Sequence, residues 1–413
     1  MRLGIDFGTT NSAVAVQRGM SAELVPLSRE EHTQRTVIHC PLDGEPLFGN
    51  DAFRSYLDQD LTGRFIRSLK SFLSQDVPST TIAGKRYEFV DLVAEYLMFL
   101  IERSVAVLGR RPDEIVMGRP ANFADIQSDS DRAERTLSEA LDRAGVTNYR
   151  FQLEPVAAAH KYESTASTEH LVLVGDFGGG TSDFAILRVG PKRRQLDDRT
   201  SDILAVDGVA KAGDHIDGHF MDCFLLEEFG KNALFRKRYT EELEPWKSPI
   251  HGQIKRLFEL HRLRDEPLNR GLKYMQKRLV NPVYAERLHR LIFDDLGYPL
   301  AWQIEESKKA LSTSAETTFR FREFYSERLD FDRPVGLAEF GESCGTTIRE
   351  YNDAITRTLS MAGVQEADID SVFLTGGTSQ LPFIRASFAA RFGEEKISAG
   401  DALTSVCIGL ALS

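Results

Sequence analysis

One pattern of thirteen residues occurs twice in this chain and constrains its fold more than any other feature. Residues 4–16 read GIDFGTTNSAVAV, and residues 174–186 read VGDFGGGTSDFAI. In both, Asp-Phe-Gly follows a short apolar run and leads into a Gly/Thr/Ser turn, after which small and apolar residues alternate. Alternation on both sides of a tight glycine turn is typical of a β-hairpin. Asp6 and Asp176 are 170 positions apart, about one domain, so the repeat predicts two similar lobes that begin with the same hairpin.

Around the two hairpins, the sequence pattern alternates between strand and helix. Residues 90–108 and 130–144 have helical periodicity, whereas 114–117 and 171–174 are strand-like. A third glycine turn, in VFLTGGTSQLP at 372–382, follows another apolar strand and precedes a helical pattern. Strands that alternate with helices predict an α/β fold.

Composition excludes several classes of protein and marks one unusual region. The chain has 413 residues, of which 42% are hydrophobic, too many for a disordered chain. With 51 Lys and Arg against 62 Asp and Glu, its formal net charge of −11 argues against a general nucleic-acid binder. Residues 231–300 hold 15 basic and 9 acidic residues, a net charge of +6 that leaves −17 elsewhere. Helical patterns at 250–264 and 270–279, with few strand signals, predict a helical insert in the second lobe.

The sequence also predicts a cytoplasmic protein with reduced thiols. The N-terminus carries Asp6 within its first apolar run and does not resemble a secretory leader. The longest apolar stretch, 92–107, is interrupted by Glu95, Glu102 and Arg103, so a membrane span is not expected. The four cysteines are far apart and show no Cys-x-x-Cys spacing; they are Cys40, Cys223, Cys344 and Cys407.

Each glycine turn presents backbone N–H groups and hydroxyls that can cradle phosphate oxygens. Asp6 and Asp176, at equivalent places in the two hairpins, are suited to flank a hydrated Mg²⁺ on those phosphates, because Mg²⁺ retains most of its waters. The turns are not P-loops, since no GxxxxGK[ST] pattern occurs and the first two turns lead into strands. One such turn alone would be an ordinary hairpin, but two matching turns together with Gly376-Gly377-Thr378 favour a nucleotide site.

The segments LGIDFGTTNS, VGDFGGGTSDFAIL and FLTGGTSQLPFI resemble the phosphate and adenosine segments of the actin-like ATPases. More narrowly, the chain resembles the nucleotide-binding domain of the DnaK-type 70-kDa heat-shock chaperones. VMGRPANFAD, FQLEPVAAAHKYE, AGDHIDGHFMD, IEESKKALS and GDALTSVCIGLAL extend the resemblance in order through nearly the whole chain, and 231–300 is its weakest stretch.

The resemblance implies an α/β, actin-like ATPase fold of two lobes, each with a mixed sheet flanked by helices, and an ATP cleft between them. Lobe I is expected at 1–175, with 394–413 returning to it. Lobe II is expected at 176–393, with a helical subdomain at about 231–330. The implied cofactors are ATP or ADP and Mg²⁺.

The resemblance also assigns roles to individual residues. Phosphates would be held in lobe I by Gly8, Thr9, Thr10 and Asn11, and in lobe II by Gly178, Gly179, Gly180 and Thr181. Catalysis would rest on Lys70, which positions the attacking water, and on Asp6, Glu154, Asp176 and Thr181. Metal contacts, mostly through water, would come from Asp6, Asp176 and Asp183. Ribose and adenine would contact Glu305, Lys308, Lys309, Ser312, Gly376, Gly377, Thr378, Gln380 and Asp401.

Two positions depart from the chaperone pattern, which usually has arginine where Lys309 and Gln380 stand. Arginine stacks on adenine through its planar guanidinium, lysine stacks less well, and glutamine carries no charge. Discrimination between ATP and GTP is therefore expected to be modest. His215 and His219, in GDHIDGH, lie near Asp214 and Asp217, but the motif favours a nucleotide-side turn over a zinc site.

The function implied is an ATP-binding, slowly hydrolysing molecular switch of chaperone type, in a short YegD-like form without a peptide clamp. Pro120 and Arg132 match residues that relay the nucleotide state to that clamp in the chaperones. Implied partners are protein clients, a co-chaperone or an exchange factor, with no nucleic acid and no membrane. The alternatives are an ATP-binding scaffold with little hydrolysis, a sugar-kinase-like enzyme and a filament-forming actin relative.

Overall fold

A computed structural model describes the chain in two compact units. The first unit comprises Met1–Gly213 and Ile348–Ser413, and the second comprises Asp214–Thr347. The described residues are 1–28, 31–59, 61–75, 79–82, 85–124, 126–196, 199–240, 242–294, 296–322, 330–400 and 404–413. Each unit is described below by itself.

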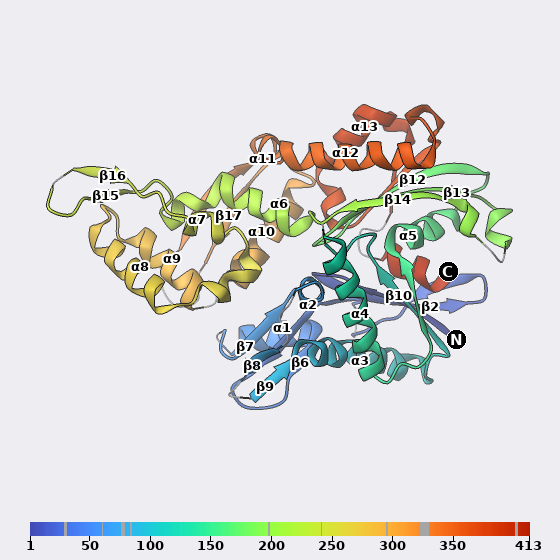
Figure 1. Ribbon diagram of the computed structural model, residues 1–413, viewed down its shortest axis with the longest axis horizontal. Helices are drawn as coiled ribbons and strands as arrows, with labels where there is room; N and C mark the ends of the chain where they lie inside the picture. The colour runs from blue at the N-terminus through green and yellow to red at the C-terminus, as the bar shows by residue number, and fades with distance from the viewer. Residues whose placement is uncertain are drawn as a thin grey trace. The chain divides into compact units, whose positions relative to one another are not determined.

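The first unit contains two mixed sheets with the same topology (Figure 1). In each, two antiparallel pairings are followed by two parallel ones, in the orders β3-β2-β1-β10-β11 and β14-β13-β12-β19-β20. The first sheet consists of β1 (Arg2–Phe7), β2 (Asn11–Arg18), β3 (Ser21–Leu24), β10 (Glu114–Arg119) and β11 (Tyr149–Leu153), and β4 (Thr33–Arg35) pairs with β2. The second consists of β12 (His170–Phe177), β13 (Ser182–Val189), β14 (Ile203–Val209), β19 (Ser371–Thr375) and β20 (Ile397–Ala399).

The helices repeat along with the sheets. In each half of the repeat, one long helix precedes the fourth strand, a second precedes the fifth strand, and a third follows it. The first set is α3 (Phe89–Leu108), α4 (Gln127–Arg143) and α5 (Glu154–Glu163), and the second is α12 (Gly345–Ala362), α13 (Pro382–Phe392) and α14 (Ser405–Leu412). The predicted α/β class and both predicted hairpins are therefore confirmed. The residue boundaries predicted for the two lobes stay a prediction.

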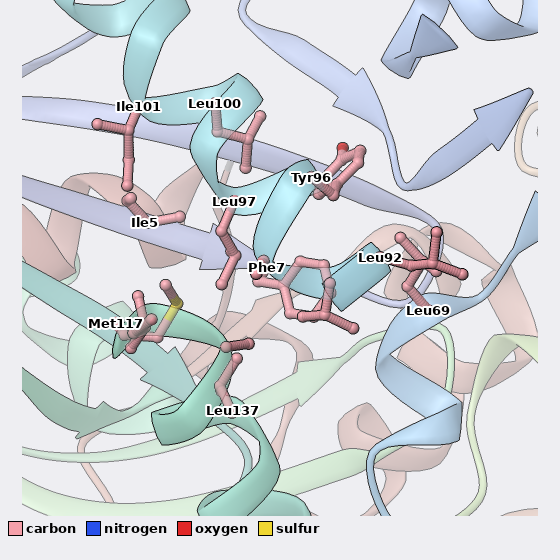
Figure 2. Packing of buried hydrophobic residues seen from close by; sticks show 14 of the residues in the cluster. Ile5, Phe7, Leu69, Leu92, Tyr96, Leu97, Leu100, Ile101, Met117 and Leu137 are labelled. Carbon is pink, nitrogen blue, oxygen red and sulfur yellow. The ribbon is translucent and has the colours of Figure 1, made fainter. Parts of the chain in front are cut away.

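The core of the first sheet is built by α3, whose apolar positions recur at helical spacing. Leu92, Tyr96, Leu97, Leu100 and Ile101 are all at most 4% exposed. Figure 2 shows these side chains directed at apolar residues of the sheet and of α4, namely Ile5, Phe7, Met117 and Leu137. Gly109 ends the helix in the left-handed conformation that glycine adopts without strain, at φ 74°. This packing fixes β1, and with it the first glycine turn.

Helices α5 and α14 pack against each other and join the two sheets, because α14 also contacts β1 and β2 whereas α5 contacts β12 and β13. Their approach is close enough to require small residues. A methyl group at Gly409 would lie 1.7 Å from the Ala157 backbone oxygen. On the other side of α14, a methyl group at Gly4 of β1 would lie 2.4 Å from the Ala411 nitrogen. The run Ala157-Ala158-Ala159 is fully buried on the α5 side.

Further elements of the first unit lie between β4 and α3 in the chain. They are β5 (Val37–Cys40), β6 (Leu47–Phe48), α1 (Gly49–Asp58), β7 (Arg64–Arg67), α2 (Leu69–Phe72), β8 (Ser79–Ile82) and β9 (Lys85–Glu88). Strands β6-β5-β7 form a small antiparallel sheet, and β8 pairs with β9.

The second unit is mainly helical, with two small hairpins. Its helices are α6 (Gly213–Phe220), α7 (Ile250–Gln253), α8 (Glu266–Arg278), α9 (Val283–Phe293), α10 (Gly297–Leu311) and α11 (Leu337–Ser343), and its strands are β15 (Leu234–Arg236), β16 (Leu243–Pro245), β17 (Glu316–Phe321) and β18 (Phe331–Gly336). The predicted helix at 270–279 is confirmed as α8. The continuous helix predicted at 250–264 is wrong, because α7 is a single turn and is followed by a 3₁₀ helix at Leu257–Leu263. The β15–β16 hairpin was not predicted.

Candidate active site

The two glycine turns occupy the same position in their hairpins. Phe7 pairs with Ser12, and Phe177 pairs with Ser182, so each turn spans four residues between matched partners. In the first turn, a methyl group at Gly8 would lie 2.2 Å from the Asn11 backbone oxygen. A side chain at this position is therefore excluded by the turn itself. In the second turn, the Gly178 N–H donates to the Thr181 carbonyl oxygen at 3.0 Å.

The tips of the two hairpins lie against each other. A methyl group at Gly179 would lie 2.7 Å from Thr10 Oγ1 and 3.0 Å from the Thr9 Cβ. A methyl group at Gly180 would lie 3.1 Å from Thr9 Oγ1. The threonines of one turn thus approach the glycines of the other. A ligand with several phosphate oxygens can therefore meet N–H and hydroxyl donors from both turns.

The third glycine turn joins the second. Gly376 has φ 85°, and a methyl group there would lie 2.1 Å from the Phe177 backbone oxygen. The Gly213 N–H donates to the Gly178 carbonyl oxygen at 3.1 Å, and a methyl group at Gly213 would lie 3.3 Å from Thr378 Oγ1. Gly377 and Gln380 are exposed beside this turn. The third turn therefore lies beside the second, whose residues are predicted to hold phosphates and whose tip meets that of the first.

Lys70 and Glu154 form a buried ion pair in the first unit. Lys70 Nζ donates to Glu154 Oε1 at 2.6 Å, and both side chains are 8% exposed. Lys70 lies on α2, which begins after Ser68 in a left-handed conformation at φ 56°. Glu154 is the first residue of α5, where the helix dipole favours a carboxylate. Burial opposes the charge on Lys70, but Glu154, Asp6 and Asp183 raise its pKa above the ordinary value, so it is a cation at neutral pH.

The charges of this pair shift the pKa values of three aspartates, Asp6, Asp176 and Asp183. Burial raises the pKa of Asp6 well above its usual value, and Glu154 and Asp176 raise it further. Burial likewise raises the pKa of Asp176, with added repulsion from Glu154 and Asp183. Lys70 opposes both shifts. Four carboxyl groups thus lie around one ammonium group, and a bound cation would reduce the repulsion among them and favour their ionised forms.

Asp183 is a carboxylate that the first hairpin lacks. It pairs with Asp176 across the second hairpin, and Ala13 pairs with Asp6 at the equivalent position of the first. Asp183 is 1% exposed, and burial with repulsion from Glu154 raises its pKa to about 7. Asp183 Oδ1 accepts from the Ala121 N–H at 2.8 Å, and Oδ2 accepts from the Thr181 hydroxyl at 2.9 Å. Sequence reasoning missed Ala121. Ala121 comes just after β10, and the third glycine turn comes directly after β19, the equivalent strand of the second repeat. The duplicated topology is therefore the signal that could have identified Ala121.

The site residues fit a hydrated Mg²⁺ better than a directly bound ion. Among the described residues, no three His, Cys, Asp or Glu side chains gather closely enough to hold a metal ion. Carboxylate oxygens with excess negative charge are nevertheless the donors that Mg²⁺ accepts, either directly or through its own waters. Asp6, Asp176 and Asp183 are the residues that would hold such an ion.

Four of the residues predicted to contact ribose and adenine lie in the second unit, with Glu305, Lys308 and Lys309 on α10 and Ser312 directly after it. Gly376, Gly377, Thr378 and Gln380 lie in the first unit. Lys308 Nζ lies 2.5 Å from Asp217 Oδ1. Burial opposes the charge on Lys308, but Asp217 and other acidic groups raise its pKa. Lys309 Nζ lies 2.9 Å from both Glu305 Oε1 and Glu306 Oε1. Ser312 donates its hydroxyl to the Lys309 carbonyl oxygen at 2.6 Å and so caps the helix end.

Two further predictions concern residues outside α10. The turn predicted at His215 and His219 is wrong, because both residues lie inside the helix α6. The rings of His215 and His219 pack edge to face with centroids 5.1 Å apart, and His219 Nε2 lies 2.9 Å from Thr347 Oγ1. Asp401, predicted to contact the nucleotide, lies outside the described residues.

A family model described as Hsp70 protein matches residues 2–233 and 298–413. The chain belongs to the Hsp70 family. Its fold is therefore the actin-like ATPase fold, with an Hsp70-type nucleotide-binding domain and no Hsp70 peptide-binding domain in the matched residues. The unmatched residues lie in the second unit and nearly coincide with 231–300, where the sequence resemblance was weakest.

Membership of the Hsp70 family supports a chaperone-type, ATP-binding function. Members of the family are ATPases in general, bind ATP or ADP with Mg²⁺, and typically act with clients and co-chaperones. Within the described part of the chain, none of the helices has the length and apolar character needed to cross a bilayer.

Proposed function

We propose that this protein is an ATP-binding, slowly hydrolysing molecular switch of the DnaK type that acts in the cytoplasm. The contact between the two hairpin tips, at Gly179 and Thr10, carries this proposal. Because the tips meet, the phosphates of one nucleotide can accept hydrogen bonds from both repeats of the motif. Motion of one repeat relative to the other would then depend on the phosphates bound between the turns.

In this proposal, the turns bind phosphates through backbone N–H groups and through the hydroxyls of Thr9, Thr10 and Thr181. Phosphoryl transfer depends mainly on positioning and on charge neutralisation. When bound, Mg²⁺ would neutralise phosphate charge, held largely through its waters by Asp6, Asp176 and Asp183.

Lys70 and Glu154 would orient the attacking water. The Lys70 ammonium group has three donors, of which one contacts Glu154 Oε1. The remaining donors can bind a water and a phosphate oxygen. Glu154 would fix the ammonium group in place, and its second oxygen would accept from a water. We propose slow turnover because Lys70, which would position that water, is already protonated and cannot remove its proton.

Calorimetry with ATP and ADP, with and without Mg²⁺, tests the proposal, together with a turnover assay. We expect both nucleotides to bind and ATP to be hydrolysed only with Mg²⁺. Asp176→Asn should abolish most of the Mg²⁺-dependent turnover. Asp370→Asn is the matched control, because Asp370 caps the far end of β12 by accepting from the Leu171 N–H at 2.8 Å. Absence of binding at millimolar nucleotide would refute the proposal.

The same measurements separate the alternatives. An ATP-binding scaffold would bind nucleotide tightly and hydrolyse almost none. A sugar-kinase-like enzyme would turn over ATP only when a sugar is added. A filament-forming relative would sediment with ATP. The switch is favoured if the protein hydrolyses ATP when no sugar is added and does not sediment with ATP.

The partner of the switch is proposed to dock on the second unit. The β15–β16 hairpin exposes Leu234, Arg236, Leu243 and Pro245 on one face, because alternate strand residues share a face. On α8, Arg270, Lys273 and Lys277 are exposed at helical spacing. Apolar residues beside basic ones suit a protein partner with an acidic, partly apolar surface.

Pull-downs with ATP and with ADP test this surface in the variant Arg270→Ser/Lys273→Ser/Lys277→Ser. Arg264 and Arg278, also basic residues of this region, are left unchanged because their Nε atoms donate to backbone carbonyls of Ile292 and Arg236. The variant Arg18→Ser/Arg110→Ser/Arg111→Ser, exposed in the first unit, is the control. A partner retained by the α8 variant and insensitive to nucleotide would contradict the proposal.

A further inference from the structure

A carboxylate is buried at the end of α5 that is electrostatically unfavourable for it. Glu163 is the last residue of the helix and is 1% exposed. The C-terminal end of a helix carries partial negative charge, which favours cations and disfavours carboxylates. A buried carboxylate there persists only if it is well paired.

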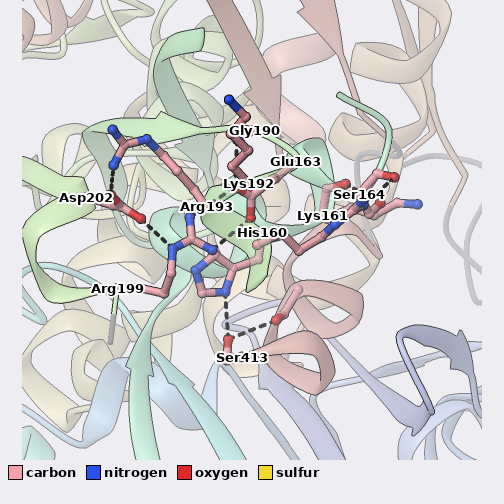
Figure 3. A network of polar contacts seen from close by, with 12 residues as sticks. His160, Lys161, Glu163, Ser164, Gly190, Lys192, Arg193, Arg199, Asp202 and Ser413 are labelled. Carbon is pink, nitrogen blue, oxygen red and sulfur yellow. Dashed lines mark hydrogen bonds and ion pairs between the residues drawn. The ribbon is translucent and has the colours of Figure 1, made fainter. Parts of the chain in front are cut away.

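The pairing comes from the loop between β13 and β14. Arg199 forms a two-pronged contact with Glu163, with Nη1 2.9 Å from Oε2 and Nη2 3.0 Å from Oε1. The Gly190 N–H also donates to Glu163 Oε1, at 2.7 Å. Figure 3 shows the guanidinium of Arg199 between Glu163 and Asp202.

Arg199 is itself held in place. Its Nε donates to Asp202, which is 1% exposed and also accepts from Arg193. Arg193 Nε lies 3.0 Å from Glu169 Oε2. The guanidinium therefore has partners on both of its edges, and its orientation is fixed by the loop rather than by α5 alone.

One turn earlier on α5, His160 connects the helix to the end of α14. His160 Nδ1 lies 3.1 Å from Ser413 Oγ, and Arg150 Nη2 donates to the Ser413 carbonyl oxygen at 2.7 Å. Burial lowers the pKa of His160 to about 4, with further lowering by Arg199 and Arg150. The ring is thus neutral at physiological pH, and the C-terminal part of α5 is fixed on two sides.

The opposite end of the same helix carries Glu154, the partner of Lys70. Ten residues of α-helix span about 15 Å and behave as a rigid rod at that length. A shift of α5 along its axis would therefore move Glu154 relative to Lys70. Displacements of about 1 Å in a catalytic arrangement can cost on the order of 100-fold in rate.

We propose that Arg199 and Glu163 are positioning residues of the active site, which fix α5 along its axis and so set the contact between Glu154 and Lys70. This inference rests on the proposed ATPase function. It assigns a role to the β13–β14 loop that neither the glycine turns nor the family match provides.

Three variants test the inference by single-turnover hydrolysis, ATP binding and thermal unfolding. Arg199→Ala should lower kcat about tenfold while the ATP Kd changes less than about twofold, since only the transition state needs the aligned pair. Arg199→Lys keeps the charge but loses the two-pronged contact, so it should recover part of the loss. Glu163→Gln keeps the shape of the side chain, so its kcat should lie between that of wild type and that of Arg199→Ala.

Arg391→Ala is the matched control. Arg391 also makes a two-pronged contact, with Nε and Nη2 2.9 and 2.6 Å from Glu366 Oε1, and its side chain is 17% exposed against 18% for Arg199. It lies on α13, and its hydrogen-bond partners among the described residues are Asn352, Thr356 and Glu366, none of which lies on α5 or next to Lys70 in the chain. It should lower the unfolding midpoint without changing kcat, which separates positioning from general stability.

A second comparison asks whether Arg199 acts through the ion pair. In a Lys70→Ala background, Arg199→Ala should change the remaining rate less than about twofold, because there is no contact left to misalign. Equal fold-losses in both backgrounds, or an equal loss in Arg391→Ala, would overturn the inference. Unchanged kcat in folded Arg199→Ala would do the same.

Hydrogen exchange supplies a readout that does not depend on hydrolysis. In nucleotide-free protein, Arg199→Ala should speed exchange in peptides that contain Glu154 as well as in those that contain Glu163. Faster exchange only around Glu163 would overturn the inference. A wild-type protein that hydrolyses no ATP would instead refute the proposed function, and the exchange experiment would still test the coupling along α5.

Discussion

Lys70 Nζ lies 2.6 Å from Glu154 Oε1, although the two residues are 84 positions apart and come from different helices. Both are buried, and three aspartates close by have raised pKa values. Lys70 opposes the raised pKa of all three aspartates. Its removal should affect the charge of the whole site rather than one contact.

Lys70→Ala should reduce ATP turnover by about 100-fold or more, while the ATP Kd changes only a few-fold. The reason is that positioning a water stabilises the transition state, whereas the turns supply most of the ground-state contacts. Single-turnover hydrolysis and calorimetry measure the two quantities. Lys211→Ala is the control, since Lys211 Nζ contacts Glu350 at 2.6 Å. Equal losses in rate and affinity would reassign Lys70 to phosphate binding.

Ionisation of Asp183 should lower the free energy of unfolding of nucleotide-free protein as the pH rises from about 4 to 8. The folded pKa of Asp183 is about 7 and exceeds the ordinary value of 3.8, so the folded state holds a proton that the unfolded state has released. The stabilisation from this proton is fully present below the ordinary pKa of 3.8 and is lost as the pH rises through the folded pKa of about 7.

Chemical denaturation without Mg²⁺ at pH 5.5, 6.5, 7.5 and 8.5 checks this dependence. Asp183→Asn should be more stable than wild type at pH 8.5 and should have the weaker pH dependence. The difference between the two proteins cancels the opposite contribution of His160, whose pKa of about 4 destabilises the folded state below its ordinary value. Parallel curves would mean that Asp183 is already ionised at pH 5.5.

The parts of the fold that local sequence determines were predictable. The hairpins follow from alternation around glycine turns, and the helix at α3 follows from apolar residues at helical spacing. The three glycine turns were predictable because each is a local motif, whereas the binding roles of their residues stay a prediction. The meeting of the first two turns at Gly179 and Thr10 depends on the packing of α5 against α14, which has no local signal.

Other features depended on contacts between distant residues. The predicted helix at 250–264 failed because its buried residues Ile254, Leu257 and Leu260 recur every three positions, the period of a 3₁₀ helix. The pairing of Glu163 with Arg199 joins a helix end to a loop 36 positions away. A charged residue at either position is most often a solvated one, so the sequence alone favours the wrong interpretation.

Restoring arginine at two positions should strengthen the binding of the base. Lys309 Nζ is shared between Glu305 and Glu306, so its charge is already engaged within α10. Lys309→Arg together with Gln380→Arg should raise ATP affinity by about 1 kcal/mol through guanidinium stacking. Discrimination against GTP should be modest in wild type. Calorimetry with ATP and GTP decides, and an unchanged ATP Kd would mean that the base is bound in another way.

The contact between α5 and α14 should tolerate no added methyl group. In Gly409→Ala, the new carbon would lie 1.7 Å from the Ala157 backbone oxygen, and backbone cannot move aside as the end of a side chain can. Overpacking in a well-packed core typically costs about 1–3 kcal/mol, and a collision with backbone belongs at or above the upper end.

Gly271→Ala provides the comparison for this last prediction. Gly271 lies inside α8, and a methyl group there would meet no atom within 4 Å. Alanine is favoured over glycine inside a helix by about 1 kcal/mol, so this variant should be slightly more stable than wild type. Thermal and chemical unfolding of the two variants should therefore shift in opposite directions. Because α5 also carries Glu154, any folded Gly409→Ala protein should in addition lose turnover, whereas Gly271→Ala should keep the wild-type rate. If Gly409→Ala were as stable as wild type, the two helices would have to lie further apart than the structure places them, and α5 would not be held firmly enough to align Glu154 with Lys70.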